Sequence, residues 1–315
     1  EFRRVLFRSS KLMNNMKKIG LTALATSLVA STAYAGEMSV SGGASLSYTG
    51  LSSASDSNPF SMGDSVTFSG GGDMDNGMSV SVSYELDGGN YDDYKMVIDT
   101  NGAGALTFSG ASVNAGGITK VNDIVPTAYT PVYETTDADD NGLATSTQTS
   151  TTGMFGYTYS DGGLMLSVGY QPNPAAAAEA ETSYAVSYDG LMDGLTLVAG
   201  MLDDGDVSEN TTFGAKYTMG SVTAAYQITD IELDAVGGND EEGSHMGISL
   251  AVNENLSVSA GRQETEFATA TADETNTGWS ASYTMGSMTI SGAFNKVENA
   301  AGSNTARSEE RRVGK

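Results

Sequence analysis

Residues 78–86 read MSVSVSYEL, and this strict alternation decides the fold class. In an extended strand the Met, Val, Val, Tyr and Leu side chains share one face, while the three Ser and the Glu share the other. A period of two is typical of a strand with one apolar and one polar side. The segment therefore predicts a β-strand that lies between an apolar and a watery environment.

The same alternation recurs along the chain and predicts fifteen antiparallel strands. They span residues 38–49, 64–73, 78–86, 94–100, 105–111, 153–160, 163–171, 181–188, 195–202, 210–218, 222–230, 245–253, 256–264, 277–283 and 287–296. Short connections rich in Gly, Asn and Asp alternate with long ones, which include 51–63, 87–93, 112–152, 172–179 and 231–244. Short turns on one side and long loops on the other indicate a transmembrane up-and-down β-barrel of the outer membrane.

Aromatic residues mark the strand ends. Four tyrosines end a strand just before a short turn: Tyr159, Tyr188, Tyr217 and Tyr283. Six other aromatic residues lie toward the long loops: Tyr48, Tyr84, Tyr170, Phe213, Tyr226 and Trp279. Two girdles at the two membrane interfaces produce this placement. A soluble β-protein is the alternative, because strands favour aromatic residues anyway, but it does not explain why they gather at the ends.

The charge is strongly acidic, with 15 Lys and Arg against 39 Asp and Glu and a net charge of -24. A nucleic-acid partner is excluded, because a phosphate backbone needs a basic surface. The chain has no cysteine, so it has neither a disulfide framework nor a thiolate metal site.

The two ends differ from the rest of the chain. Residues 1–12 and 307–315 are basic and resemble translated adaptor oligonucleotides, so we expect a non-native leader and tail, and a chain that is a fragment. Residues 13–35 have the layout of a signal peptide that starts at Met13 or Met16, with Lys17 and Lys18, an apolar run and the cleavage site Ala-Tyr-Ala. Residues 36–306 then form the barrel, with 112–152 as an inserted loop.

Strand number predicts a pore. Bacterial barrels of this kind have even strand numbers, so fifteen strands indicate a sixteen-stranded design with the closing strand missing. A barrel this wide leaves an aqueous channel, and the inward phase of the strands is rich in Ser, Thr and Gly, which suit contact with water.

Residues 16 to about 296 resemble the Gram-negative general diffusion porins, particularly those of alphaproteobacteria. The resemblance rests on the signal peptide, on the first strands EMSVSGGASLSYTG and DSVTFSGGGDMDNGMSVSVSYEL, and on GITKVNDI at 117–124. It implies that the third long loop, 112–152, folds into the barrel and narrows the pore, and that the protein is a homotrimer in the cell outer membrane. In the family an acidic loop faces a basic wall cluster. This sequence departs from that pattern, since only Lys95 and Lys216 fall in inward phase and no arginine cluster is present.

The acidic residues of the third loop are the candidate pore constriction: Asp123, Glu134, Asp137, Asp139 and Asp140. Inside a pore they create a negative potential that concentrates cations. We therefore expect a cation-preferring channel for small hydrophilic solutes; ordinary solvation of an acidic loop is the competing interpretation.

A second pattern in the same loop concerns Ca²⁺. Asp137, Asp139 and Asn141 match the opening of a Ca²⁺-binding loop. The twelfth position is Gln148 instead of Glu, and no helices flank the segment, so diffuse binding of divalent cations is the stronger expectation and no cofactor is predicted.

Few other residues carry chemistry. Arg262 and Lys296 fall in outward phase near the long-loop rim, where they either meet lipopolysaccharide phosphates or extend into the interface as ordinary rim cations. His245 is the only histidine and opens a strand after an acidic loop, so we expect it at the rim. No catalytic motif surrounds it, and we predict no enzyme. A barrel that serves as a structural anchor or adhesin without an open pore remains the alternative function.

Overall fold

The computed structural model describes residues 38–51, 58–111, 115–133, 143, 153–172, 179–205, 207–234, 238–270, 272–300 and 308–313. Their strands are β1 (Met38–Leu51), β2 (Phe60–Asp73), β3 (Ser79–Asp87), β4 (Asn90–Asp99), β5 (Ala105–Ala111), β6 (Met154–Asp161), β7 (Leu164–Gln171), β8 (Glu181–Tyr188), β9 (Leu195–Asp203), β10 (Ser208–Met219), β11 (Val222–Leu233), β12 (Glu241–Ala251), β13 (Leu256–Phe267), β14 (Glu274–Met285), β15 (Met288–Glu298) and β16 (Ser308–Val313). One 3-10 turn, η1 (Gly117–Lys120), follows β5 in this part of the chain. Within the described ranges, no helix has the length and apolar character needed to cross a bilayer.

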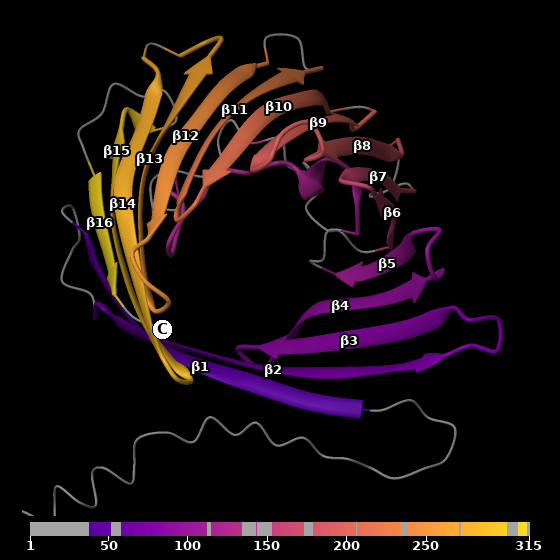
Figure 1. The fold of residues 1–315 in the computed structure, drawn as a ribbon. Helices are drawn as coiled ribbons and strands as arrows, with labels where there is room; N and C mark the ends of the chain where they lie inside the picture. The colour runs from indigo at the N-terminus through magenta and orange to yellow at the C-terminus, as the bar shows by residue number, and fades with distance from the viewer. Residues whose placement is uncertain are drawn as a thin grey trace, which may run out of the picture.

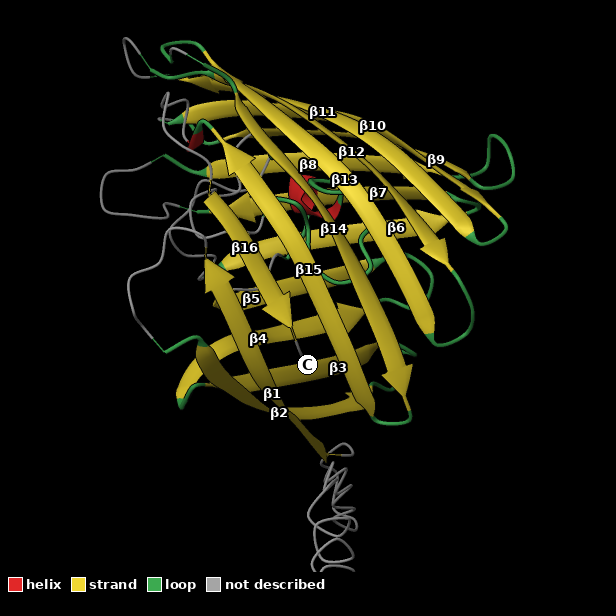
Figure 2. Ribbon diagram, turned by 90° about the vertical axis from the view of Figure 1, so that its left-hand side faces the viewer, coloured by secondary structure: helices red, strands yellow, loops and turns green. Residues whose placement is uncertain are grey.

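The strands form one closed antiparallel barrel. Each strand pairs with its neighbours in sequence, and β1 pairs with both β2 and β16, so the sheet has no free edge (Figure 1). Figure 2 shows that the strands cross the barrel at a steep tilt, as closure of a sheet requires. The prediction of an up-and-down barrel of sixteen-stranded design is confirmed, and all fifteen predicted strands are present.

The closing position is occupied by β16. It pairs over Tyr48–Leu51 of β1 and over Gly292–Val297 of β15. The residues of β16 belong to the segment that the sequence predicts to be a non-native tail. The sequence assigns the closing position to a strand that is missing from the chain. Backbone pairing needs amide and carbonyl groups and no particular side chain, which is why a short segment of this composition fits the gap.

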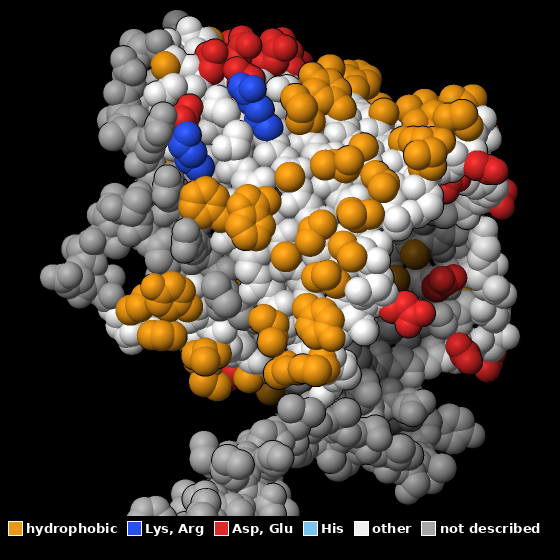
Figure 3. Space-filling model, turned by 60° about the vertical axis from the view of Figure 1, so that its left-hand side comes forward, with side chains coloured by type: hydrophobic (Ala, Val, Ile, Leu, Met, Phe, Trp, Pro, Cys, Tyr) orange, Lys and Arg blue, Asp and Glu red, His pale blue; other side chains and the backbone are white. Residues whose placement is uncertain are grey.

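The two faces of the wall have opposite character. On β7, Leu166, Val168 and Tyr170 point outward and are 39–45% exposed, whereas the intervening Ser167 is 2% exposed and points inward. Apolar side chains cover the outer surface, and basic side chains lie beside acidic ones at one edge of it (Figure 3). Bare apolar surface of this extent is stable in lipid and not in water.

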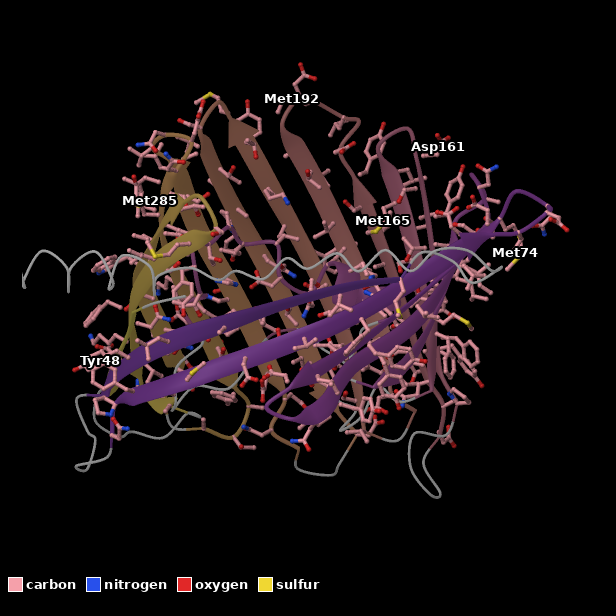
Figure 4. All side chains as sticks on the ribbon, turned by 90° about the horizontal axis from the view of Figure 1, so that it is seen from below. Tyr48, Met74, Asp161, Met165, Met192 and Met285 are labelled. Carbon is pink, nitrogen blue, oxygen red and sulfur yellow. The ribbon has the colours of Figure 1, made fainter. Side chains whose placement is uncertain are left out.

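The hairpin turns divide the barrel ends as the sequence predicts, with one exception. Met74, Asp161 and Met192 lie at short turns, at the end of the barrel away from Tyr48 (Figure 4). The predicted long loop at 87–93, however, is wrong. Gly88 and Gly89, with φ of 56° and 83°, make a two-residue turn between β3 and β4, and the polar residues after it continue the strand.

We expect the outward face to reject charge much more strongly than the inward face. Ile248 of β12 is 50% exposed on the outer surface, and its neighbour Ser249 points inward. Replacing Ile248 by Lys should destabilise the barrel by about 2 kcal/mol in lipid vesicles, and Ser249→Lys by clearly less. Denaturant unfolding of the two variants measures the difference, and equal losses would contradict the assignment of the faces.

Candidate functional site: a loop docked inside the barrel

The connection between β5 and β6 enters the barrel and runs along its inner wall. Residues 115–133 of this connection, called the constriction loop below, lie against β6 to β15. Five hydrogen bonds mark the path: the amides of Gly117, Ile124, Ala128 and Tyr129 donate to Ser167 Oγ (3.0 Å), Gln227 Oε1 (2.9 Å), Ser259 Oγ (2.8 Å) and Ser280 Oγ (3.1 Å), and Asn295 Nδ2 donates to the Pro131 carbonyl (2.7 Å). The predicted inward folding of the third loop is thus present in these residues.

Inward-facing glycines make room for the loop. A Cβ placed on Gly200 of β9 would lie 2.8 Å from Ile118 and 2.9 Å from Val121. At Gly214 it would lie 2.7 Å from Ile124, and at Gly247 2.6 Å from Val125. A Cβ on Gly156 of β6 would likewise meet Ala115 and Gly116, and a Cβ on Gly169 of β7 would meet Gly116. The inward position of these glycines in the sequence pattern suggests that they line a water-filled lumen. In the structure they contact the loop instead, and their lack of a side chain lets the loop approach the backbone of the wall.

Apolar loop residues fill the space above these glycines. Ile118 is fully buried against Leu202 of β9, and Val121 packs against Ala185 and Val198. Met165 of β7, which points inward, packs against the second group (Figure 4). The interface between loop and wall is therefore a small dry core inside the barrel, and dispersion and apolar burial hold it together.

Gln227 of β11 clamps the loop backbone. Its Oε1 accepts from the Ile124 amide at 2.9 Å, and its Nε2 donates to the carbonyls of Val121 and Asn122, each at 2.8 Å. The side chain is 1% exposed, so these bonds lie in a region without competing water. No sequence pattern indicates this role, because a glutamine on the inward side of a strand is expected to line the pore.

Asp123 is turned toward the wall. Its Oδ2 accepts from the Tyr133 hydroxyl at 2.8 Å, its Oδ1 accepts from the Val125 amide at 2.8 Å, and His245 Nδ1 lies 3.4 Å away. Burial alone would raise the pKa of Asp123, but the imidazole of His245, the Val125 amide and the Tyr133 hydroxyl favour the charged form and hold the pKa below its usual range. The geometry gives Asp123 a part in fixing the loop, and its part in ion selection stays a prediction.

The rim position expected for His245 is wrong. β12 begins at Glu241, so His245 is its fifth residue and points inward, where it is 3% exposed beneath the loop. Glu241 and Glu242, which the sequence pattern places in a loop, belong to β12 and pair with β13. Strand ends are the least certain part of a pattern-based prediction, because polar strand ends and loops have similar composition.

The half of the inner wall formed by β1 to β4 faces open space. A cavity of about 510 Å³ lies against it, lined mainly by small residues of these strands and by Lys95 and Val97 of β4. The serines among them are Ser39, Ser69, Ser81 and Ser83. Here the small polar inward residues do what the sequence predicts and line the lumen.

Charged side chains gather above this cavity. A β-bulge sets Asp92 and Asp93 opposite Glu85 of β3, which shares its face with the cavity-lining Ser83. Asp93 interacts electrostatically with Asp92, Glu85 and Lys95. The open side of the lumen thus carries three carboxylates and one ammonium group. The sequence pattern places the two aspartates in a loop, so this group could not be predicted from it.

Lys120 is a second cation beside the lumen. It ends η1, and its side chain is exposed while its neighbours Ile118 and Val121 are buried against the wall. Partial burial lowers the pKa of Lys120, and the like charge of Lys95 lowers it further, so the two ammonium groups are near each other. The charge that the described part of the loop presents to the lumen is therefore positive.

The remaining candidate residues fall into two groups. Lys216 lies on β10 opposite the inward Ala225, near the short-turn end and away from the loop. Glu134, Asp137, Asp139, Asp140, Asn141 and Gln148 lie outside the described residues. Among the residues that are described, no group of three or more His, Asp or Glu side chains is arranged to hold a metal ion.

This arrangement defines a membrane channel protein, in which a closed barrel is narrowed from within by one of its own loops. The sequence profile of the Gram-negative porin family matches residues 20–314, and the chain belongs to that family. It is accordingly a protein of the outer membrane.

Solved porin structures share the fold at low sequence identity. One porin is 18% identical with a TM-score of 0.67, covering 88% of this chain and 99% of its own. The trimer form of OmpT from Vibrio cholerae is 14% identical with a TM-score of 0.67 and coverage of 89% and 98%. The anion-selective porin from Comamonas acidovorans is 15% identical with a TM-score of 0.65 and coverage of 88% and 98%. A search of the curated proteins finds no match.

We expect the position of the loop to depend on Gly200. Gly200→Val should push Ile118 and Val121 off the wall, move the loop into the lumen and lower the single-channel conductance, because the added atoms fall within 3 Å of both side chains. Gly43→Val is the matched control, since Gly43 points inward from β1 with nothing within 4 Å of a Cβ. Similar conductance losses in both variants would contradict the docking role.

Proposed function

We propose that this porin passes small hydrophilic solutes and ions by passive diffusion and prefers cations. The observation that carries the proposal is the group of Glu85, Asp92 and Asp93 on the open side of the lumen. Carboxylates around a water-filled constriction raise the local concentration of cations. The acidic residues predicted for the third loop add to this potential if they face the lumen, while Lys95, Lys120 and Lys216 oppose it.

Selectivity belongs to the side chains and not to the fold. The Comamonas acidovorans porin shares the architecture and is named as anion-selective, so the likeness itself favours neither sign. The excess of 39 Asp and Glu over 15 Lys and Arg supports the cationic choice for this chain, because its mouths and loops carry the same sign of charge.

Two partners complete the proposal. Arg262 and Lys296 point outward at one level of the wall, since Thr277 pairs with both, and each contacts a glutamate on its own strand. We propose that both side chains bind lipopolysaccharide phosphates at the rim, where outer-membrane lipid surrounds the barrel. A homotrimer is supported by the trimer form of the Vibrio cholerae neighbour and by an apolar outer hollow of about 730 Å³ lined by Phe68, Tyr84, Leu86, Tyr91 and Tyr94.

The alternative function is a structural anchor or adhesin without an open pore, and the docked loop favours it to the extent that it fills half of the inner wall. Planar-bilayer recording separates the two functions. Stepwise conductance supports the channel, and silence from a correctly folded barrel supports the anchor.

We expect neutralisation of the wall carboxylates to weaken cation preference. The combined change Glu85→Gln, Asp92→Asn and Asp93→Asn should lower the ratio of potassium to chloride permeability about two- to threefold, because the local negative potential falls. Reversal potentials in a salt gradient measure the ratio. Asp64→Asn is the control, since Asp64 of β2 pairs with Ala44 on the outward face. An unchanged ratio in the triple variant, or anion preference in the native chain, would contradict the proposal.

We expect Lys120 to oppose cation preference and to do so less at alkaline pH. Its pKa is lowered from 10.5, so its positive charge is lost at a lower pH than that of an ordinary lysine. Cation preference of the native channel should therefore rise as the pH increases toward the lowered pKa of Lys120. Lys120→Gln should show the raised preference already at neutral pH. Lys296→Gln, on the outer surface, should leave the reversal potential unchanged. The idea fails if Lys120→Gln and the native channel have the same pH profile.

A further inference from the structure

We propose that His245 is the positioning residue of the constriction loop: with Asp123 and Tyr133 it forms a buried latch that holds the loop on the wall. The proposal rests on the proposed open channel only for its effect on solutes. These three residues are called the loop latch below.

The loop latch joins the wall to both ends of one loop segment. Asp123 and Tyr133 are ten residues apart, and the Tyr133 hydroxyl donates to Asp123 Oδ2 at 2.8 Å. The His245 imidazole comes from β12 and touches both: Nδ1 lies 3.4 Å from Asp123 Oδ1, and its ring meets the Tyr133 ring edge-on at 5.5 Å. A single wall side chain therefore restrains the whole segment from 123 to 133.

His245 is buried in the wall under the loop. It is 3% exposed, and neither ring nitrogen makes a hydrogen bond with good geometry. A buried imidazole without such bonds is costly unless a nearby charge compensates for the lost water. The Asp123 carboxylate, whose Oδ1 lies 3.4 Å from His245 Nδ1, is that charge.

The surroundings leave Asp123 as the controlling partner. On the two strands that flank β12, Gln227 and Gln263 stand directly opposite His245, and neither titrates. Arg262 and Glu264 of β13 and Glu242 of β12 face outward, away from the imidazole. Glu241 shares the inward phase of His245 but lies four residues along the strand. The loop contributes the Asp123 carboxylate and the Tyr133 hydroxyl, which share a hydrogen bond.

The charge of Asp123 sets the pH range in which the loop latch is strong. Asp123 keeps its charge down to a pH below the ordinary carboxyl range, so its contribution is present above that pH and is lost as the pH falls through its lowered pKa. Among the groups that lower this pKa, His245 has the largest effect, so a variant without the imidazole should lose the contribution of Asp123 at a higher pH.

Hydrogen exchange of the folded full-length chain tests the loop directly. At neutral pH, exchange of residues 115–133 should be about three- to tenfold faster in His245→Gln than in the native chain, while exchange of β11, β12 and β13 stays unchanged. Ser249→Ala, an inward change on the same strand, should keep the native exchange of residues 115–133. Native exchange of these residues in His245→Gln, or an equal increase in the three strands, overturns the proposal.

Tyr133→Phe covers the case in which His245→Gln does not fold. It should also speed exchange of residues 115–133, because it removes the hydroxyl that joins Tyr133 to Asp123; native exchange of these residues in this variant would overturn the proposal. Partitioning of neutral polyethylene glycols into the native channel gives the functional reading, since their entry depends on width and not on charge. Absence of current from every folded variant would refute the proposed channel, while hydrogen exchange would still decide the loop latch.

Discussion

Lipid offers no hydrogen-bond partner to a peptide group, and the architecture of this protein follows from that constraint. Every strand must find two neighbours, so the sheet closes on itself through the pairing of β1 with β16. Closure with sixteen strands produces a tube that is wider than inward side chains can fill. The lumen must then hold water, protein, or both. The constriction loop is the protein that occupies part of this lumen.

The inner wall is accordingly divided between two kinds of environment. From β6 to β15 it resembles a protein core, in which Ile118 and Val121 press on glycines and Gln227 satisfies the loop backbone. From β1 to β4 it faces the open cavity with serines, Lys95 and a group of carboxylates. The docked half sets the shape of the passage, while the charged side chains beside the open lumen lie on the second half and at Lys120 of the loop.

Sequence predicted the barrel well because the period of two is imposed by lipid on every strand, as in MSVSVSYEL. It could not predict the loop path, since Gly200, Gly214 and Gln227 have the same inward phase whether they contact water or protein. His245 and the aspartates at 92 and 93 were misplaced for one reason: polar strand ends resemble loops in composition. The Asp123 contacts depend on residues up to 122 positions away in sequence, which no local pattern reveals.

The long reach of the docked loop has a consequence for assembly. The segment leaves the chain after β5, yet its last described hydrogen bond joins Pro131 to Asn295 on β15, 164 residues later. Its binding surface does not exist until ten further strands have been added to the sheet. Contacts of such high sequence separation form late, because chain entropy is lost before they contribute. The passage should therefore acquire its final width as one of the last events of folding, after the strands of the wall have paired.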